Sequence, residues 1–111
     1  MNSYTLIGRL VKDLEIKESE NKKKYGYITI AVDRTYKNAE GEKITDFIDM
    51  IVWNETAERV AEYCKKGDLL GVNGRIETRM TEVDDHNEKV TTLVCDRVYF
   101  LSSKKETESE K

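Results

Sequence analysis

The sequence predicts an all-β fold, a five-stranded Greek-key barrel with one helix between the third and fourth strands. Five runs of residues alternate between apolar and polar side chains, as half-buried strands do. One further segment repeats its apolar residues every three or four positions, which is typical of a helix. Glycines interrupt the first and fourth strand patterns, where a closed sheet needs bent strands. Because 111 residues suffice for only one modest core, we expect a single domain over residues 1–101.

The first two strands are predicted over residues 4–12 and 25–34, with a polar, exposed turn over residues 17–24 between them. Gly8 would allow a bulge or a close backbone approach in the first strand. In the second strand, Ile28, Ile30 and Val32 share one face. We expect that face to form part of the core.

The third strand is predicted over residues 45–53, after a long hairpin loop over residues 35–43 that contains the turn signal Asn38-Ala39-Glu40-Gly41. The helix is predicted over residues 55–66, with Asn54 as its cap and Gly67 as its stop. Its apolar side chains are small and form a narrow stripe, namely Ala57, Val60, Ala61 and Cys64. Such a helix can lie close against a sheet or close a barrel end.

The last two strands are predicted over residues 68–80 and 90–101, joined by a polar loop over residues 82–89. Gly71 and Gly74 are expected to mark a sharp bend in the fourth strand. Residues 102–111 carry no apolar side chain, so we expect a short disordered polar tail. The resulting order of elements is that of an OB-fold, which binds oligonucleotides or sugars on a strand face and on hairpin loops.

The third strand places Phe47, Asp49, Ile51 and Trp53 on one face. Two large aromatics on one side of a sheet could stack on unpaired nucleic acid bases, since every base has a π face. The alternative is that both rings belong to the core, because large aromatics are usually well buried.

The charge of the chain argues against binding by overall positive potential, since the formal net charge is −3 and the isoelectric point is near 5.3. Local clusters of cations would still attract phosphates. The candidate phosphate contacts lie on the first and fourth strands and on the hairpin between the second and third; each could equally be an ordinary surface cation. They are Arg9, Lys12, Arg34, Lys37, Lys43, Arg75 and Arg79.

Other classes of protein find little support in the sequence. Cys64 and Cys95 stand far apart with no neighbouring histidine, so neither a disulfide nor a metal site is expected. His86, the only histidine, lies among polar residues and is interpreted as a solvated loop residue. We therefore expect no enzyme, no cofactor and no metal, and, without a signal peptide or an apolar membrane-spanning run, a cytoplasmic protein.

Several short motifs occur in an order and spacing that resemble the bacterial single-stranded DNA-binding protein family over residues 2–101. They are Leu6-Ile7-Gly8-Arg9-Leu10, Ala31-Val32-Asp33-Arg34, Thr45-Asp46-Phe47, Val52-Trp53, Tyr63-Cys64-Lys65-Lys66-Gly67 and Gly74-Arg75-Ile76-Glu77-Thr78-Arg79. The resemblance implies an OB-fold that forms homotetramers and binds single strands without sequence preference in DNA replication, recombination and repair. It also implies base stacking on Tyr36, Phe47 and Trp53. Tyr36 could otherwise be an ordinary exposed loop tyrosine.

The chain departs from the family pattern at three places. Met80 and Thr81 follow Arg79 where a further stacking aromatic is often found, and Asp49 puts a negative charge on the aromatic face. The sequence contains no proline and lacks the acidic tip Asp-Asp-Ile-Pro-Phe that recruits partner enzymes in the family. Recruitment of replication and repair enzymes by that route is therefore not expected.

Two rival functions remain open at the level of sequence. An OB-fold accessory protein, similar to a primosome factor, would act mainly through protein contacts. An OB-fold that binds oligosaccharides or serves as a toxin subunit would fit less well, because the chain lacks a signal peptide and paired cysteines.

Overall fold

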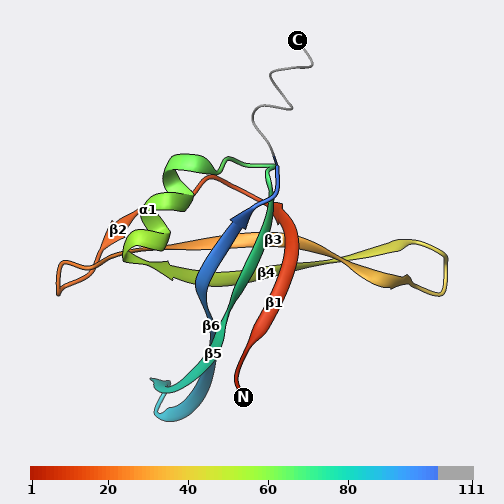
Figure 1. Ribbon diagram of the computed structural model, residues 1–111. Helices are drawn as coiled ribbons and strands as arrows, with labels where there is room; N and C mark the ends of the chain where they lie inside the picture. The colour runs from red at the N-terminus through yellow and green to blue at the C-terminus, as the bar shows by residue number, and fades with distance from the viewer. Residues whose placement is uncertain (103–111) are drawn as a thin grey trace.

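The computed structural model describes residues 1–102, in which six strands and one helix form a barrel with projecting hairpins (Figure 1). The elements follow one another in the order β1 (Tyr4–Leu10), β2 (Lys17–Glu18), β3 (Lys24–Lys37), β4 (Lys43–Trp53), α1 (Asn54–Tyr63), β5 (Leu69–Val83) and β6 (His86–Phe100). Within the same residues, no helix has the length and apolar character needed to cross a membrane.

The five long strands close on themselves. The sheet has the order β1-β5-β6-β4-β3-β2, and a short pairing of β1 with β3, at Arg9 opposite Ala31 and Leu10 opposite Ile30, completes the barrel. β4 and β6 run parallel, whereas the other pairs are antiparallel. The predicted OB-fold, with its helix between the third and fourth long strands, is therefore confirmed.

Two glycines allow the strands to approach one another closely. A Cβ on Gly8 would lie 2.5 Å from the carbonyl oxygen of Ala31, at the seam between β1 and β3. A Cβ on Gly74 would lie 1.8 Å from the carbonyl oxygen of Val94, next to the register shift that forms a bulge between β5 and β6. Of the two glycines expected to mark a bend, Gly74 lies at this register shift, whereas Gly71 pairs regularly with Tyr99.

The core fills the barrel and continues under the helix. Ile28 and Ile30 are fully buried, as predicted, whereas Val32, nearer the projecting hairpin, is only partly buried. α1 packs against β3, β4 and β6 with the small side chains of Ala57 and Val60, both fully buried. Small side chains let the helix axis lie close to the barrel, so α1 covers one end of the core.

Both helix boundaries differ from the prediction. α1 begins at Asn54, whose φ is 51°, and the preceding residue Trp53 serves as the N-cap without a side-chain hydrogen bond, so Asn54 is not the cap. The helix ends at Tyr63, because Cys64 adopts an extended conformation that turns its side chain into the core. The next backbone N–H groups are bound by carboxylates, that of Lys65 by Asp68 at 2.9 Å and that of Lys66 by Asp13 at 2.7 Å.

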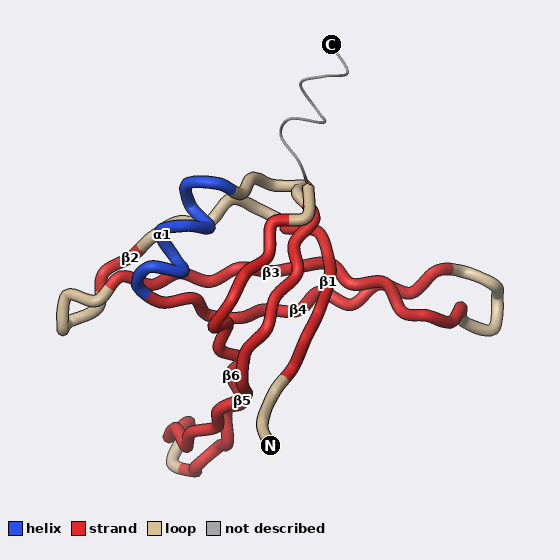
Figure 2. The backbone as a smooth tube through the Cα atoms, viewed as in Figure 1, coloured by secondary structure: helices blue, strands red, loops and turns tan. Residues whose placement is uncertain are grey.

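The two long hairpins extend further than the alternation of side chains indicated. β3 runs to Lys37, so Tyr36 lies in a strand and not in a loop. β5 and β6 run to a tight turn at Asp84 and Asp85, both with positive φ, as two-residue hairpin turns require. His86 therefore starts a strand, although it is exposed as expected. In Figure 2 the strand colour reaches almost to both tips.

The segment over residues 17–24 is also more ordered than a turn, because Lys17 and Glu18 pair with β3 as β2. At the other end of the chain, the backbone N–H of Ser102 donates to the carbonyl of Leu69, and its hydroxyl accepts from the Leu69 N–H at 2.6 Å. The remainder of the predicted disordered tail, residues 103–111, lies outside the described residues.

Candidate nucleic-acid interface

The outer face of β3 and β4 carries a row of aromatic side chains. Residues directly opposite each other on antiparallel strands share a face, and the register places Tyr25 opposite Trp53, Tyr27 opposite Ile51, and Ala31 opposite Phe47. The neighbouring residues on β4, Met50 and Val52, point into the core. The row therefore stands on the side of the sheet that faces away from the barrel interior.

Phe47 and Trp53 are held differently on this face. Phe47 has 66% of its surface exposed, opposite the small side chain of Ala31. Trp53 is partly buried and lies against Tyr25, with ring centroids 5.3 Å apart and ring planes 38° apart. Tyr25 in turn meets the edge of Tyr27, whose centroid is 6.0 Å away. The core interpretation therefore fails for Phe47, and Trp53 forms one wall of an open aromatic cluster.

Trp53 borders a groove of about 560 Å³ between the β3–β4 face and the β5–β6 hairpin. Its apolar lining comes from Tyr25, Tyr27, Ile51, Trp53 and Val94, and its polar lining from Glu18, Ser19, Glu20, Glu77, Thr78, Arg79 and Thr92. The shape suits a flat, unpaired base, since aromatic side chains form the walls and polar side chains lie around them.

Tyr25 and Tyr27 were not among the residues selected from the sequence. The signal was present, because both alternate with the core residues Ile28 and Ile30 and so must lie on the same outer face as Trp53. Which β4 residues lie opposite Tyr25 and Tyr27 depends on how β3 pairs with β4. The alternation of side chains along β3 alone does not determine this pairing.

Tyr36 lies on the projecting part of β3, where the hairpin is irregular. The register passes from Asp33 opposite Thr45 to Lys37 opposite Lys43, so residues 34–36 of β3 oppose a single residue of β4. Such a bulge re-aims the side chains that it contains. Tyr36 has 59% of its surface exposed, and its hydroxyl accepts a hydrogen bond from Arg34 Nη1 at 3.0 Å.

Three of the candidate phosphate contacts are engaged by carboxylates. Arg34 donates through Nε and Nη2 to Asp46, each at 2.9 Å, and these hydrogen bonds lower the pKa of the Asp46 carboxyl. Lys43 lies 3.6 Å from Asp33; the hydrogen bond from Thr45 is the main cause that lowers the pKa of Asp33. Each of these two cations thus faces a carboxylate that is ionised at neutral pH.

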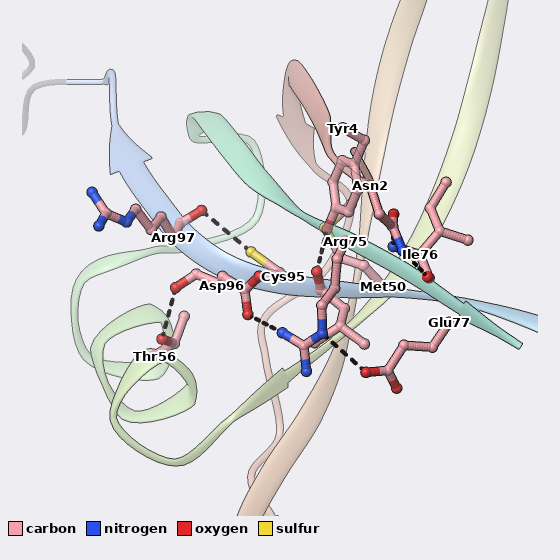
Figure 3. A network of polar contacts seen from close by, with 11 residues as sticks. Asn2, Tyr4, Met50, Thr56, Arg75, Ile76, Glu77, Cys95, Asp96 and Arg97 are labelled. Atoms are coloured by element: carbon pink, nitrogen blue, oxygen red, sulfur yellow. Dashed lines mark hydrogen bonds and ion pairs between the residues drawn. The ribbon is translucent and has the colours of Figure 1, made fainter.

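Arg75 is the third, and Figure 3 shows it between two carboxylates. Its Nε donates to Glu77 at 2.9 Å and its Nη1 to Asp96 at 2.6 Å, and these bonds raise its pKa. The backbone carbonyl of Asp96 accepts from Thr56 at 3.4 Å, so the network connects β5, β6 and the first turn of α1. Arg75 therefore has a structural partner on each side.

The remaining four candidates, Arg9, Lys12, Lys37 and Arg79, form no ion pair within residues 1–102. Arg79 lines the groove beside Trp53. Lys12 lines a smaller hollow together with Asp13, Glu15, Lys17 and Tyr27. Arg9 donates to the carbonyl of Gly67 at 3.0 Å, away from the aromatic row. The structure thus brings Lys12 and Arg79 to the aromatic cluster and Lys37 to the hairpin that carries Tyr36.

Both cysteines are free and buried, and burial raises the pKa of each thiol to about 11. No group of three or more His, Cys, Asp or Glu side chains suited to a metal ion occurs in the part of the chain that the structure describes.

Comparison with known proteins adds the decisive observation, because residues 1–101 match the model of the Single-strand binding protein family. The chain belongs to this family. It is 44% identical over 105 residues to Single-stranded DNA-binding protein 2 of Staphylococcus aureus, across 94% of this chain and 74% of that protein. It is also 44% identical over 108 residues to Single-stranded DNA-binding protein 1 of Clostridium acetobutylicum, across 96% and 98% respectively.

A solved structure shares the fold of this chain. The structure titled "Plasmodium falciparum SSB complex with ssDNA" superposes with a TM-score of 0.77, covering 92% of this chain and 96% of that chain at 21% sequence identity. The resemblance inferred from the motifs is therefore confirmed at the level of family and fold.

Proposed function

We propose that this chain binds single-stranded DNA without sequence preference and so protects it in replication, recombination and repair. The observation that carries the proposal is the exposed aromatic row on β3 and β4, in a member of the Single-strand binding protein family. Bases stack on Trp53, Phe47 and Tyr36, each contributing roughly 1–3 kcal/mol. Tyr27, 53% exposed beside the groove, joins them.

The phosphates between stacked bases need cations along the same path. Arg79 at the groove, Lys12 beside Tyr27 and Lys37 on the projecting hairpin fit that requirement, since none has a carboxylate partner within residues 1–102. Each phosphate that they engage steepens the dependence of log K on log salt by about 0.7. Arg9 and Arg75 lie in structural contacts and contribute less.

Titration with oligo(dT) tests the proposal directly, because Trp53 is the only tryptophan. Stacking of a base in the groove quenches the fluorescence of Trp53, and the quenching saturates at a fixed number of nucleotides per chain. A gel shift on the same samples reports binding independently. Binding by gel shift with an unchanged Trp53 spectrum would remove the groove from the interface, and no binding by either measurement would refute the function.

We also propose that the chain acts as a homo-oligomer, with four copies as the expected number. Ile7, Gly71 and Tyr99 form one row across β1, β5 and β6, and Ile7 and Tyr99 are more than half exposed. Only Arg9 and Leu10 of β1 pair with β3, which leaves the edge of residues 4–8 for a strand of another copy. A second copy could therefore bind both to an apolar face and to a strand edge.

The charge pattern keeps one alternative open, an accessory OB-fold protein that acts mainly through protein contacts. Three candidate cations are engaged by carboxylates, and Glu18, Glu20 and Glu77 line the groove, so the positive potential along the aromatic row is reduced. Weak binding to long single strands at low salt, together with tight capture of a protein partner, would favour that function. In either role the chain acts in the cytoplasm by binding and not by catalysis.

A further inference from the structure

Arg34 lies at the centre of a contact that includes Tyr36, Asp46 and both strands of the projecting hairpin. Its Nε and Nη2 donate to the two carboxylate oxygens of Asp46, each at 2.9 Å. Its third nitrogen, Nη1, donates to the hydroxyl of Tyr36 at 3.0 Å, and its guanidinium carbon lies 5.8 Å from the centroid of that ring. All three guanidinium nitrogens therefore have a protein partner.

The side chain of Tyr36 makes few other contacts that fix its position. The bulge over residues 34–36 removes its register partner on β4, and its ring meets no other aromatic ring within residues 1–102. The hydrogen bond from Arg34 is the one that its side chain makes in the described part of the chain. The position of the exposed Tyr36 ring therefore depends on Arg34, and the position of Arg34 depends on Asp46.

We propose that Arg34 and Asp46 are positioning residues that hold the ring of Tyr36 in place for a DNA base. Asp46 fixes the guanidinium by a two-bond fork, and the guanidinium fixes the Tyr36 hydroxyl. An exposed ring that is held before binding loses less side-chain freedom when a base stacks on it. The inference rests on the proposed function, and it changes the role assigned to Arg34 from the sequence, since a guanidinium satisfied by a carboxylate is not a free phosphate contact.

The two roles of Arg34 predict opposite effects of Asp46→Asn. If Asp46 only withholds Arg34 from the phosphates, the substitution frees the cation, so binding tightens and the salt dependence steepens by about 0.7. If Asp46 positions Tyr36 through Arg34, the substitution releases the ring, so binding weakens and the salt dependence stays as in the parent protein.

The experiment measures the dissociation constant for a dT oligonucleotide over a series of salt concentrations. The variants are Tyr36→Ala, Tyr36→Phe, Arg34→Lys, Asp46→Asn, the double variant D46N/Y36A, and Glu40→Gln as the matched control. Glu40→Gln removes one negative charge from the same hairpin, and the hydrogen bond described for Glu40 uses only its backbone N–H. Thermal unfolding confirms that each variant folds.

We expect Tyr36→Ala to weaken binding about tenfold. A roughly threefold loss of affinity is expected for each of Asp46→Asn, Arg34→Lys and Tyr36→Phe. The reference is Glu40→Gln for Asp46→Asn and the parent protein for the other two, and the salt dependence of binding stays unchanged. D46N/Y36A binds no more weakly than Tyr36→Ala alone, because Asp46 acts through a ring that is already gone. Tyr36→Phe keeps the ring and the charges but removes the acceptor, so it tests the hydrogen bond alone.

Two results would overturn the inference while leaving the proposed function intact. In the first, the Asp46→Asn variant binds DNA at least as tightly as Glu40→Gln. In the second, Asp46→Asn weakens DNA binding by the same factor in the Tyr36→Ala background as in the parent protein. A Tyr36→Ala variant that binds like the parent would refute the role of Tyr36 itself, and the inference with it. Trp53 quenching in the same titrations reports whether DNA binding as such is retained.

Discussion

Phe47 and Trp53 lie on the same face of the sheet but differ in their surroundings. Phe47 stands opposite Ala31 with two thirds of its surface exposed, whereas Trp53 packs on Tyr25 and lines the groove. An exposed ring contributes little to folding because its surface stays in water in both states. We therefore expect substitution of Phe47 to change DNA binding without changing stability, and substitution of Trp53 to change both.

Phe47→Ala should weaken oligo(dT) binding by roughly 1–3 kcal/mol and leave the melting temperature nearly unchanged, because the ring has few packing partners. Fluorescence titration and thermal unfolding of the same sample measure both effects. Tyr63→Ala is the control for binding, since Tyr63 is an exposed aromatic on α1 whose ring lies against Phe100 of β6 and not in the aromatic row of β3 and β4. Equal losses in the two variants would contradict a specific role for Phe47.

Alternation along a single strand was enough to place Phe47 and Trp53 on one face, because side chains in a strand point to opposite sides in turn. It could not reveal the partners of the cations. Arg75 and Asp96 are 21 residues apart, and Arg34 and Asp46 meet only because β3 and β4 pair. The sequence therefore supplied candidate site residues, while the structure distinguishes the cations held by carboxylates from those, such as Arg79 and Lys12, that lie beside the aromatic cluster.

At the scale of the elements, the ends of strands and of the helix were harder to predict than their existence. Hairpin arms that project from the barrel have both faces in water, so the alternation of side chains fades while the backbone pairing continues to Lys37 and Val83. The helix ended early because Cys64 is buried by an extended backbone. Helix propensity and end charges favoured a longer helix, and the tertiary contact of Cys64 outweighed them.

The small-residue face of α1 leads to a test of packing. Val60→Ala should lower the free energy of unfolding by about 1.5–3 kcal/mol, because Val60 is fully buried and its methyl groups would leave a cavity. Urea unfolding at a fixed protein concentration measures the change. Glu62→Ala, on the exposed side of the same helix, should stay within about 0.5 kcal/mol of the parent. Similar losses in both would contradict a specific packing role for Val60.

At the scale of the whole molecule, binding potential and assembly depend on where charges and apolar groups lie and not on their totals. A net charge of −3 coexists with two cations beside the aromatic cluster, Arg79 and Lys12, which form no ion pair in the described residues. On β1, β5 and β6, exposed apolar side chains lie on the barrel face formed by those strands. We therefore propose that nucleic acid binds the β3–β4 face and that further copies bind the face of β1, β5 and β6.

Light scattering tests the assembly. The parent chain should have the mass of a tetramer, and Tyr99→Glu should reduce it, because a carboxylate placed opposite an apolar partner surface loses its hydration. Thr91→Glu, an exposed position on the same strand near the hairpin, is the matched control and should keep the parent mass. A monomeric parent at micromolar concentration would refute the proposed oligomer, although not the DNA-binding face.

The two buried cysteines determine how the protein can be labelled. Since burial raises both thiol pKa values to about 11, Cys64 and Cys95 are almost wholly protonated at neutral pH, and protonated thiols react slowly with maleimides. A single cysteine introduced at the exposed tip of the β3–β4 hairpin would then be modified selectively in the folded state. A fluorophore attached there would report DNA binding close to the hairpin without removal of either native cysteine.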